Sequence, residues 1–330
     1  MAPHPLLTLP AMEGDRARVE AELRAAVQTP TAALTEMAGH LIGAGGKRVR
    51  PLFAVAAGAC AEGHEGPVSL DVIRGGVAVE LVHLGSLYHD DVIDEAITRR
   101  GIESVNGRWG NLRAILSGDF LLAKASELAA SLGTEVAGLL AATIGRLCEG
   151  EVLELQDAFQ VDRSEAAYLA SIDGKTASLL AAAARIGAIV GGLERPDIDR
   201  LTRFGAAYGT AFQIVDDVLD LVATDQQLGK PAGHDLVEGV YTLPVLRSLG
   251  GGDGDELRSL LGAPLTPEVA ERARKLVASG DGIDSAVATA QAYVDDATEA
   301  LAPLADRAPA RALQAAAGQL LVDLAAVRSA

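Results

Sequence analysis

The feature that most constrains this chain is an apolar pattern of helical period that runs nearly from end to end. Apolar residues recur every three to four positions, and none of these segments alternates with the period of two expected of a strand. Ala and Leu, both strong helix formers, supply much of the 49% hydrophobic content. The expected helices span residues 16–40, 49–61, 69–94, 112–130, 135–155, 165–191, 197–221, 267–278, 283–301 and 308–327. The sequence therefore predicts an all-α fold.

The organisation of the chain favours a single domain. A length of 330 residues is enough to bury a large core, and no Ser/Pro-rich linker or shift in composition divides the sequence. Segments containing Gly and Pro separate the apolar stretches, as is typical of turns between helices. We expect one helical domain over residues 1–330, with about ten or more helices and with residues 1–15 as a flexible N-terminal segment.

Charge and hydropathy exclude several classes of protein. The formal net charge is −17, from 28 Lys and Arg against 45 Asp and Glu, whereas nucleic-acid partners require basic surfaces. The most apolar stretch, residues 179–193, contains Arg185 and is too short to span a membrane. The N-terminus lacks the pattern of a signal peptide. We expect a cytoplasmic protein without a transmembrane segment, whose cysteines, Cys60 and Cys148, are buried and reduced.

Two acidic clusters carry the strongest chemical information. Asp-Asp-x-x-Asp occurs late in one expected helix and again 126 positions later, late in another. The first and last aspartates of each cluster share a helix face, where like charges repel. The residues concerned are Asp90, Asp91 and Asp94 in the first cluster and Asp216, Asp217 and Asp220 in the second.

The surroundings of these clusters indicate a metal site. A single such cluster is often a solvated helix face, but both clusters lie within strongly apolar helices, so their acids must face a polar cavity or a counterion. Mg²⁺ prefers one or two carboxylates together with water and substrate phosphates. The pair of clusters therefore predicts a phosphorylated substrate that is held through divalent metal ions.

Basic residues accompany the clusters. Residues 45–51 (Gly-Gly-Lys-Arg-Val-Arg-Pro) open a helix, and glycines with cations at a helix N-terminus can form an anion cradle. Arg99 and Arg100 follow the first cluster, where they could grip a diphosphate in bidentate fashion. Lys175 precedes a run of Ala and Leu, and Lys230 follows the second cluster. In a chain this acidic, we interpret these cations as part of an anion site.

His83 lies seven residues before Asp90, on nearly the same helix face. A lone histidine in that setting is more often a core residue than a ligand, but the nearby cluster favours a functional role. Glu80 and His83 also match the Glu-x-x-His spacing of di-iron bundles. That alternative requires a second Glu-x-x-His, and the six histidines of the sequence supply none.

Taken together and in this order, the motifs resemble those of the trans-polyprenyl diphosphate synthases. The resemblance covers roughly residues 43–244: the Gly-Gly-Lys-Arg-x-Arg-Pro turn, both acidic clusters, Arg99-Arg100-Gly101, Lys175-Thr176 and Phe212-Gln213. It implies the isoprenoid synthase fold, with helices around a deep central cavity. It also implies elongation of an allylic diphosphate, such as farnesyl or geranylgeranyl diphosphate, by isopentenyl diphosphate through ionisation, condensation and elimination, in a homodimer.

The resemblance assigns a role to each matching residue. The six aspartates would hold two or three Mg²⁺ ions that bind the allylic diphosphate. Isopentenyl diphosphate would be held by Lys47, Arg50, His83 and Arg100. The allylic diphosphate would also contact Arg99, Lys175 and Lys230. Thr176 and Gln213 would line the reacting centre beside Lys175. The released diphosphate would serve as the base.

Two positions refine this expectation. Many members of the family carry a lysine where this chain has Val240, so one cation near the allylic diphosphate is missing. Gly85 and Ser86 precede Asp90 by five and four residues, and by helical phase they point away from the metal site down the cavity. In short-chain members a bulky residue there stops the growing tail. Two small residues therefore predict a long-chain product.

Other functions compete with this interpretation. A short-chain synthase would share the chemistry and end at farnesyl or geranylgeranyl diphosphate. A terpene cyclase or a head-to-head prenyl synthase would share the metal-bound ionisation of a diphosphate, but a cyclase would have no use for the Lys47 and Arg50 cradle, since it holds no second diphosphate. A noncatalytic prenyl-diphosphate-binding subunit of a heteromeric synthase would be expected to lack an acidic cluster. An acidic Ca²⁺-binding scaffold would leave the ordered cations unexplained.

Overall fold

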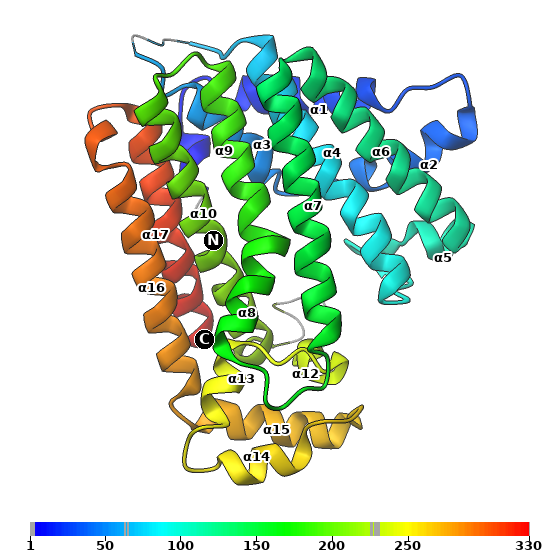
Figure 1. The fold of residues 1–330 in the computed structure, drawn as a ribbon, viewed down its shortest axis with the longest axis vertical. Coiled ribbons are helices and arrows are strands. Elements are labelled where there is room, and N and C mark those ends of the chain that lie inside the picture. Colours follow the sequence, from blue (N-terminus) through cyan, green and yellow to red (C-terminus); the bar gives the residue numbers. More distant parts are fainter. Residues whose placement is uncertain (1–3, 63, 65, 225–226, 228–231, 330) are drawn as a thin grey trace.

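The computed structural model describes residues 4–62, 64, 66–224, 227 and 232–329. Long helices run side by side and enclose the core, and shorter helices form a lobe at one end (Figure 1). The long helices are α1 (Met12–Ala26), α2 (Ala32–Gly43), α3 (Val49–Gly58), α4 (Leu70–Ile93), α6 (Asn111–Ser131), α7 (Thr134–Gln156), α9 (Ser178–Val190), α10 (Arg195–Val222), α15 (Pro267–Ser279), α16 (Gly282–Ala300) and α17 (Ala308–Arg328). The all-α, single-domain prediction is confirmed.

Short elements fill the connections between these helices. They comprise α5 (Val105–Trp109), α8 (Glu165–Ile172), α12 (His234–Glu238), α13 (Leu243–Ser248), α14 (Gly254–Leu260), the 3-10 turns η1 (Pro5–Thr8) and η3 (Ala302–Leu304), and the π-helical turn η2 (Asp173–Ala177). Strands β1 (Thr98–Arg99) and β2 (Ile102–Glu103) form a two-residue antiparallel hairpin directly after the first acidic cluster. No strand was expected, since a pairing this short leaves no periodicity in the sequence.

Two expected helices are divided in the structure. The chain breaks between α1 and α2 around Pro30, which lacks the backbone N–H that an uninterrupted helix requires. The expected helix over 165–191 is interrupted by the π-helical turn η2, which carries Lys175 and Thr176. Such π-turns occur frequently at functional sites.

The N-terminal segment that we expected to be flexible is packed from residue 4 onward. Leu6 in η1 and Met12 in α1 are buried, and η1 contacts α17. Burial of these apolar side chains outweighs the loss of chain entropy that ordering costs. The expectation for the cysteines is half confirmed, because Cys60 is buried whereas Cys148 is exposed on α7.

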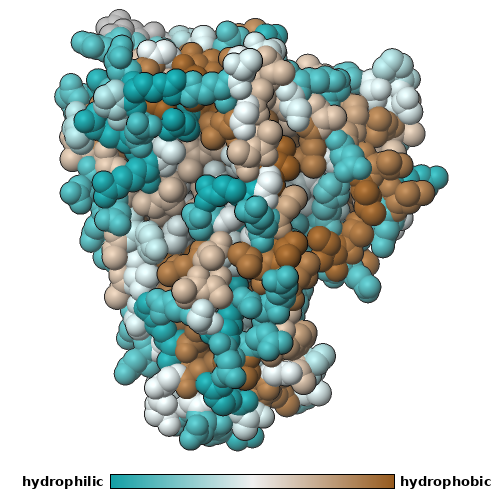
Figure 2. Space-filling model, viewed as in Figure 1, coloured by the Kyte–Doolittle hydropathy of each residue, from teal (hydrophilic) through white to brown (hydrophobic). Residues whose placement is uncertain are grey.

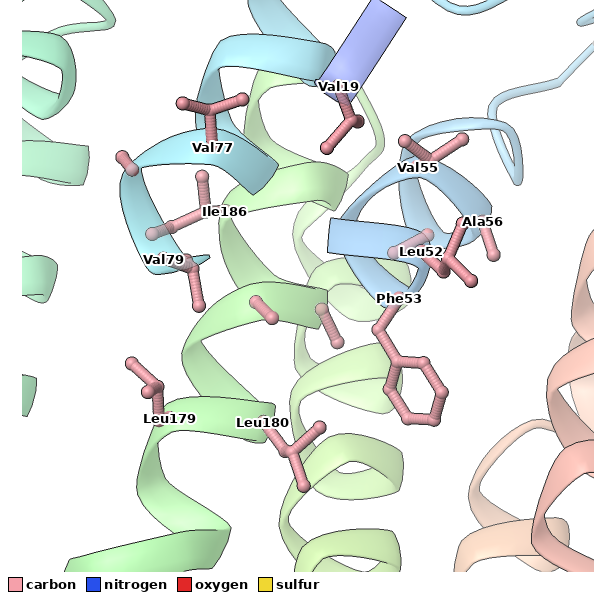
Figure 3. Close-up of a cluster of buried hydrophobic side chains, with 14 of the residues drawn as sticks. Val19, Leu52, Phe53, Val55, Ala56, Val77, Val79, Leu179, Leu180 and Ile186 are labelled. Atoms are coloured by element: carbon pink, nitrogen blue, oxygen red, sulfur yellow. The ribbon is translucent and has the colours of Figure 1, made fainter. Parts of the chain in front are cut away.

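The core lies where α3, α4, α9 and α10 meet. Figure 3 shows Ile186 of α9 directed at Val77 and Val79 of α4, and Leu180 of the same helix beside Phe53 of α3. The helices approach closely at Gly187, where a Cβ would lie only 2.0 Å from the carbonyl oxygen of Ala54. This packing fixes the two helices that carry the acidic clusters, α4 and α10. No helix within the described residues is both long and apolar enough to cross a bilayer.

Candidate active site

A cavity of about 1390 Å³ opens at the C-terminal halves of α4 and α10. In Figure 1, α12 lies below the lower ends of α7 and α8, which also line this cavity. In the part of the chain that the structure describes, acidic side chains outnumber Lys and Arg side chains in the lining of this cavity. The acids are Asp90, Asp94, Glu95, Glu151, Glu154, Asp216, Asp217, Asp235 and Glu238, against the cations Arg99, Arg163 and Lys175. An anionic substrate could enter such a cavity only together with additional positive charge.

The first acidic cluster divides between two roles. Asp90 and Asp94 line the cavity, one helical turn apart. Asp91 is fully buried and does not line it. Its Oδ1 accepts a hydrogen bond from Nε of Arg99 at 2.6 Å and lies at the same distance from Nη2 of that guanidinium, as an ion pair. Asp91 therefore holds Arg99 at the cavity wall, which places only two carboxylates of this cluster where a metal could bind.

The second cluster lies on α10. Asp216 and Asp217 line the cavity, and Asp217 is anchored by the hydroxyl of Tyr168 at 2.5 Å and by the amide of Gln213 at 2.8 Å. Asp220 is buried outside the cavity lining, and its Oδ2 accepts the backbone N–H of Asp235 at 3.2 Å. Asp220 thereby ties α10 to α12.

This donor set fits Mg²⁺. No three acidic, histidine or cysteine side chains of the described residues converge on a common point that could hold an ion. A hard ion would therefore meet one or two carboxylates at a time and take its remaining ligands from water and phosphate, which is the arrangement that Mg²⁺ prefers. All-oxygen ligands of this kind disfavour zinc, which prefers nitrogen and sulfur.

Each acidic cluster contains one carboxylate whose pKa is raised to about 7. Burial raises the pKa of Asp90 to about 7, with Lys175 opposing the rise and Glu151 adding to it. Burial also raises the pKa of Asp217 to about 7, although Tyr168 and Gln213 donate to its charged form. Free aspartates ionise near pH 3.9. A bound divalent cation would therefore compete with protons at these two sites near neutral pH.

We predict a matching pH dependence. Because both folded-state pKa values lie above the unfolded value, the protonated folded form is favoured, and the metal-free protein should lose stability as the pH rises from about 4 through about 7. Mg²⁺ should oppose this loss by binding the ionised carboxylates. Thermal unfolding should therefore show a small Mg²⁺-induced rise in Tm at pH 6 and a larger one at pH 8. An equal rise at both pH values would contradict the prediction.

Lys175 projects from η2 into the cavity. Its Nζ lies 2.7 Å from Glu151 Oε2 and 2.6 Å from Glu154 Oε1, both on α7. Burial alone would lower the pKa of Lys175, but the two glutamates outweigh burial and raise it, so the ammonium stays charged. Neighbouring Thr176 donates to Gln213 Oε1 at 2.8 Å. A hydrogen-bonded chain thus runs from Thr176 through Gln213 to Asp217, and the three expected reacting-centre residues are brought together.

The cationic turn lies beside the cavity. His83 lines the cavity, whereas Lys47, Arg50 and Arg100 do not. Lys47 is exposed, and Arg100 donates to the carbonyl oxygens of Leu41 and Gly45. Burial, and then Arg50 and Arg100, lower the pKa of His83 well below its usual value, so its imidazole is neutral. Of the four residues expected to hold isopentenyl diphosphate, only His83 lines the cavity, and Arg50 and Arg100 lie close enough to His83 to lower its pKa.

Of the two expected chain-length residues, Gly85 lies on the face of α4 that packs on α6. A Cβ at Gly85 would lie 3.1 Å from Gly118 O and 3.2 Å from Leu122 Cγ. Ser86 donates its hydroxyl to the carbonyl oxygen of His83. Neither residue lines the cavity, contrary to the expectation that both point down it. Val240 does line it, and Lys230 lies outside the described residues.

Sequence reasoning missed the residues that hold the others in place. Glu151 and Glu154 lie three positions apart on α7, a spacing that marks a shared helix face and could have drawn attention to them. Tyr168 offers no comparable signal, because its contact with Asp217 joins residues 49 positions apart. Arg163 also lines the cavity, where its Nε lies 3.1 Å from Asp157.

Comparisons with known proteins agree with this geometry. The profile of the family described as Polyprenyl synthetase matches residues 31–277. The chain is 41% identical to heptaprenyl diphosphate synthase component 2 of Geobacillus stearothermophilus, over 88% of this chain and 90% of that protein. It is 39% identical to nonaprenyl diphosphate synthase of Mycobacterium tuberculosis, over 92% of this chain and 91% of that protein.

The fold also matches solved structures over nearly the whole chain. A polyprenyl synthase from Caulobacter crescentus, complexed with calcium and isoprenyl diphosphate, superposes with a TM-score of 0.87. The two share 35% sequence identity, and the match covers 95% of each chain. The likeness therefore extends over the whole helical domain, including the parts beyond the motifs.

Proposed function

This chain belongs to the polyprenyl synthetase family of prenyltransferases, and we propose that it is a Mg²⁺-dependent synthase of long-chain all-trans polyprenyl diphosphates. The observation that carries the proposal is that residues of both acidic clusters line one cavity, together with His83 and with Lys175, which is paired to two glutamates. Isopentenyl diphosphate and an allylic diphosphate are the proposed substrates. The Caulobacter crescentus relative, complexed with isoprenyl diphosphate, supports this choice.

The residues suggest how the reaction proceeds. When bound, Mg²⁺ would neutralise the diphosphate and promote its departure from the allylic carbon. Asp90 and Asp94, facing Asp216 and Asp217, are the proposed ligands. Asp91 and Asp220 are proposed to position Arg99 and α12, respectively. Arg99 and Lys175, together with Lys230, would contact the allylic diphosphate and stabilise charge on the leaving group.

The remaining lining would protect the carbocation. Apolar side chains such as Leu87, Phe159 and Val240 line the cavity and exclude water from it. The oxygen atoms of Thr176 and Gln213 can stabilise positive charge nearby. Lys47, Arg50, His83 and Arg100 would hold isopentenyl diphosphate, whose double bond attacks the cation. The departing diphosphate would then accept the proton that is lost.

Incubation of the protein with isopentenyl diphosphate, farnesyl diphosphate and Mg²⁺ tests this function. After dephosphorylation, chromatography should show a ladder that ends in long prenols. Products that stop at farnesyl or geranylgeranyl length would keep the chemistry but support a short-chain synthase. A complete lack of product with every allylic primer would support a noncatalytic subunit. The noncatalytic subunit is kept as a second candidate because the Geobacillus stearothermophilus relative is named as a component of a synthase.

The length of the product should respond to Gly85. We predict that Gly85→Phe shortens the product, because a Cβ there already meets Gly118 O at 3.1 Å, so an aromatic ring must displace its neighbours below the first acidic cluster, where we propose that the growing tail runs. The measurement is the chain-length distribution at saturating substrate. Ser86→Ala serves as the control and should leave the distribution unchanged. An unaltered distribution in a folded Gly85→Phe protein would contradict the long-chain argument.

The exposed faces of α6 and α7 support a homodimer. Leu112 and Leu116 on α6 are 72% and 55% exposed, and Val152 on α7 is 51% exposed. Figure 2 shows apolar side chains gathered along the side of the molecule where α5 and α6 lie. Clustered apolar surface of this kind marks contact sites. We predict that light scattering gives twice the chain mass of 33.9 kDa and that Leu112→Glu combined with Leu116→Glu gives monomers. A monomeric unmodified protein would contradict this assembly.

A further inference from the structure

A buried cluster of charges lies behind His83. We call Glu80, Arg48, Arg50 and Arg100 the arginine–glutamate cluster. Glu80 lies on α4, is only 2% exposed, and accepts a hydrogen bond from Arg48 Nη1 at 3.1 Å. The Arg48 side chain is completely buried. Arg48 therefore cannot meet a substrate in this arrangement, although it belongs to the same cationic turn as Lys47 and Arg50.

Two of these arginines are positioned by groups other than Glu80. Arg48 lies 2.6 Å from Glu20 of α1 and donates to the carbonyl oxygen of Ile42 at 3.1 Å. Arg100 donates to the carbonyl oxygens of Leu41 and Gly45. The turn is closed tightly over both side chains, since a Cβ at Gly46 would lie 3.0 Å from Arg100 Nη1. The geometry of the turn should therefore survive the loss of the Glu80 charge.

Glu80 matters more for the charge balance of the cluster than for the geometry of the turn. Burial lowers the pKa of both Arg50 and Arg100, and in each case Glu80 is the strongest influence that opposes burial. Within the described residues, Arg50 Nε is buried without a hydrogen-bond partner. Three guanidiniums thus share one buried carboxylate, with the partly exposed Glu20 adding a second negative charge beside Arg48, and a bound anion would complete this balance.

We propose that Glu80 is the resident counterion of the isopentenyl diphosphate site, stabilising the empty site and repelling the diphosphate that later shares its arginines. Glu80 would thus be a positioning residue that trades substrate affinity for stability of the unliganded protein. This inference rests on the proposed function insofar as isopentenyl diphosphate is the ligand. The more general claim does not depend on the identity of the ligand: the affinity of any anion that binds beside Arg50 and Arg100 should depend on the charge of Glu80.

The test compares Glu80→Gln with the unmodified protein in thermal unfolding, without metal, with and without isopentenyl diphosphate. The substituted amide would keep an acceptor for Arg48 but remove the negative charge. We expect a lower Tm without ligand, a larger ligand-induced rise in Tm, and a several-fold lower Kd for isopentenyl diphosphate in calorimetry. An equal ligand-induced rise in both proteins would overturn the inference, since it would leave Glu80 only as an anchor for Arg48.

Glu20→Gln provides the matched control. It removes the other carboxylate that anchors Arg48, so it should lower Tm without increasing the ligand-induced rise. A greater rise in this control as well would overturn the inference. If Glu80→Gln does not fold, the double variant with Arg48→Gln removes one charge of each sign, and its ligand-induced rise must still exceed that of Arg48→Gln alone.

Inorganic diphosphate separates this inference from the proposed function. If isopentenyl diphosphate stabilises neither protein but inorganic diphosphate stabilises Glu80→Gln more, the counterion role stands and the proposed substrate is wrong. If neither anion stabilises either protein, both the site and the counterion role are overturned.

Discussion

Replacement of Asp90 by Asn is expected to lower kcat for prenyl transfer by about 10³-fold, because it removes the charge of a proposed metal ligand from the point where we propose that the diphosphate departs. Asp90 lines the cavity one turn from Asp94, and the amide of asparagine carries no charge to hold a cation. The concentration of Mg²⁺ that gives half-maximal activity should rise in the same variant. The measurement is the initial rate as a function of Mg²⁺ concentration.

Two further variants sharpen this result. Asp91→Asn should raise the KM for the allylic diphosphate by releasing Arg99, while its Mg²⁺ requirement stays unchanged, because Asp91 does not line the cavity. Asp119→Asn, on the exposed side of α6, should behave like the unmodified protein. If Asp91→Asn rather than Asp90→Asn altered the Mg²⁺ requirement, the division of roles within the first cluster would be wrong.

Gly150→Ala is expected to destabilise the protein by about 3 kcal/mol, at the upper end of the usual cost of overpacking. The added Cβ would lie 2.5 Å from the backbone nitrogen of Lys175 and 2.8 Å from Ser171 O. Backbone atoms cannot rotate away as a side chain can, so α7 and η2 must separate. Because η2 carries Lys175 and Thr176, kcat should fall together with the free energy of unfolding. Chemical denaturation and initial rates measure the two effects.

Gly145→Ala is the matched control on the same helix. A Cβ at Gly145 meets nothing within 4 Å, so the change should stabilise the protein by about 0.5–1 kcal/mol through helix propensity alone. Its kcat should not change. If the two variants had the same stability, the close crossing of α7 and η2 would not be a determinant of the site.

Much of the fold could be predicted because long amphipathic and buried helices leave a periodic pattern in the sequence. The acidic clusters could be predicted equally well, since the spacing of the aspartates along α4 and α10 indicates which of them share a helix face. The division between α1 and α2 was missed although Pro30 marks it. The π-helical turn η2 was missed because a single extra residue per turn hardly disturbs helical periodicity.

The sequence predicted which residues form the candidate site, but not how these residues contact one another. Helical phase groups Asp90 with Asp94, but only the folded structure shows that Asp91 turns away to hold Arg99. Tyr168 is bonded to Asp217 across 49 positions, and no local pattern records such a contact. The neighbouring cations Lys47 and Arg48 look equivalent in the sequence, yet Arg48 is buried and Lys47 is exposed.

The central claim is that metal ions in this cavity connect the two acidic clusters to an allylic diphosphate. The most direct measurement is a crystal structure of the protein with Mg²⁺ and an unreactive thio-analogue of farnesyl diphosphate. We predict metal ions on Asp90 and Asp94 and on the facing second cluster, with the diphosphate between them beside Arg99 and Lys175. A diphosphate bound elsewhere, or metal ions bound away from both clusters, would contradict the account.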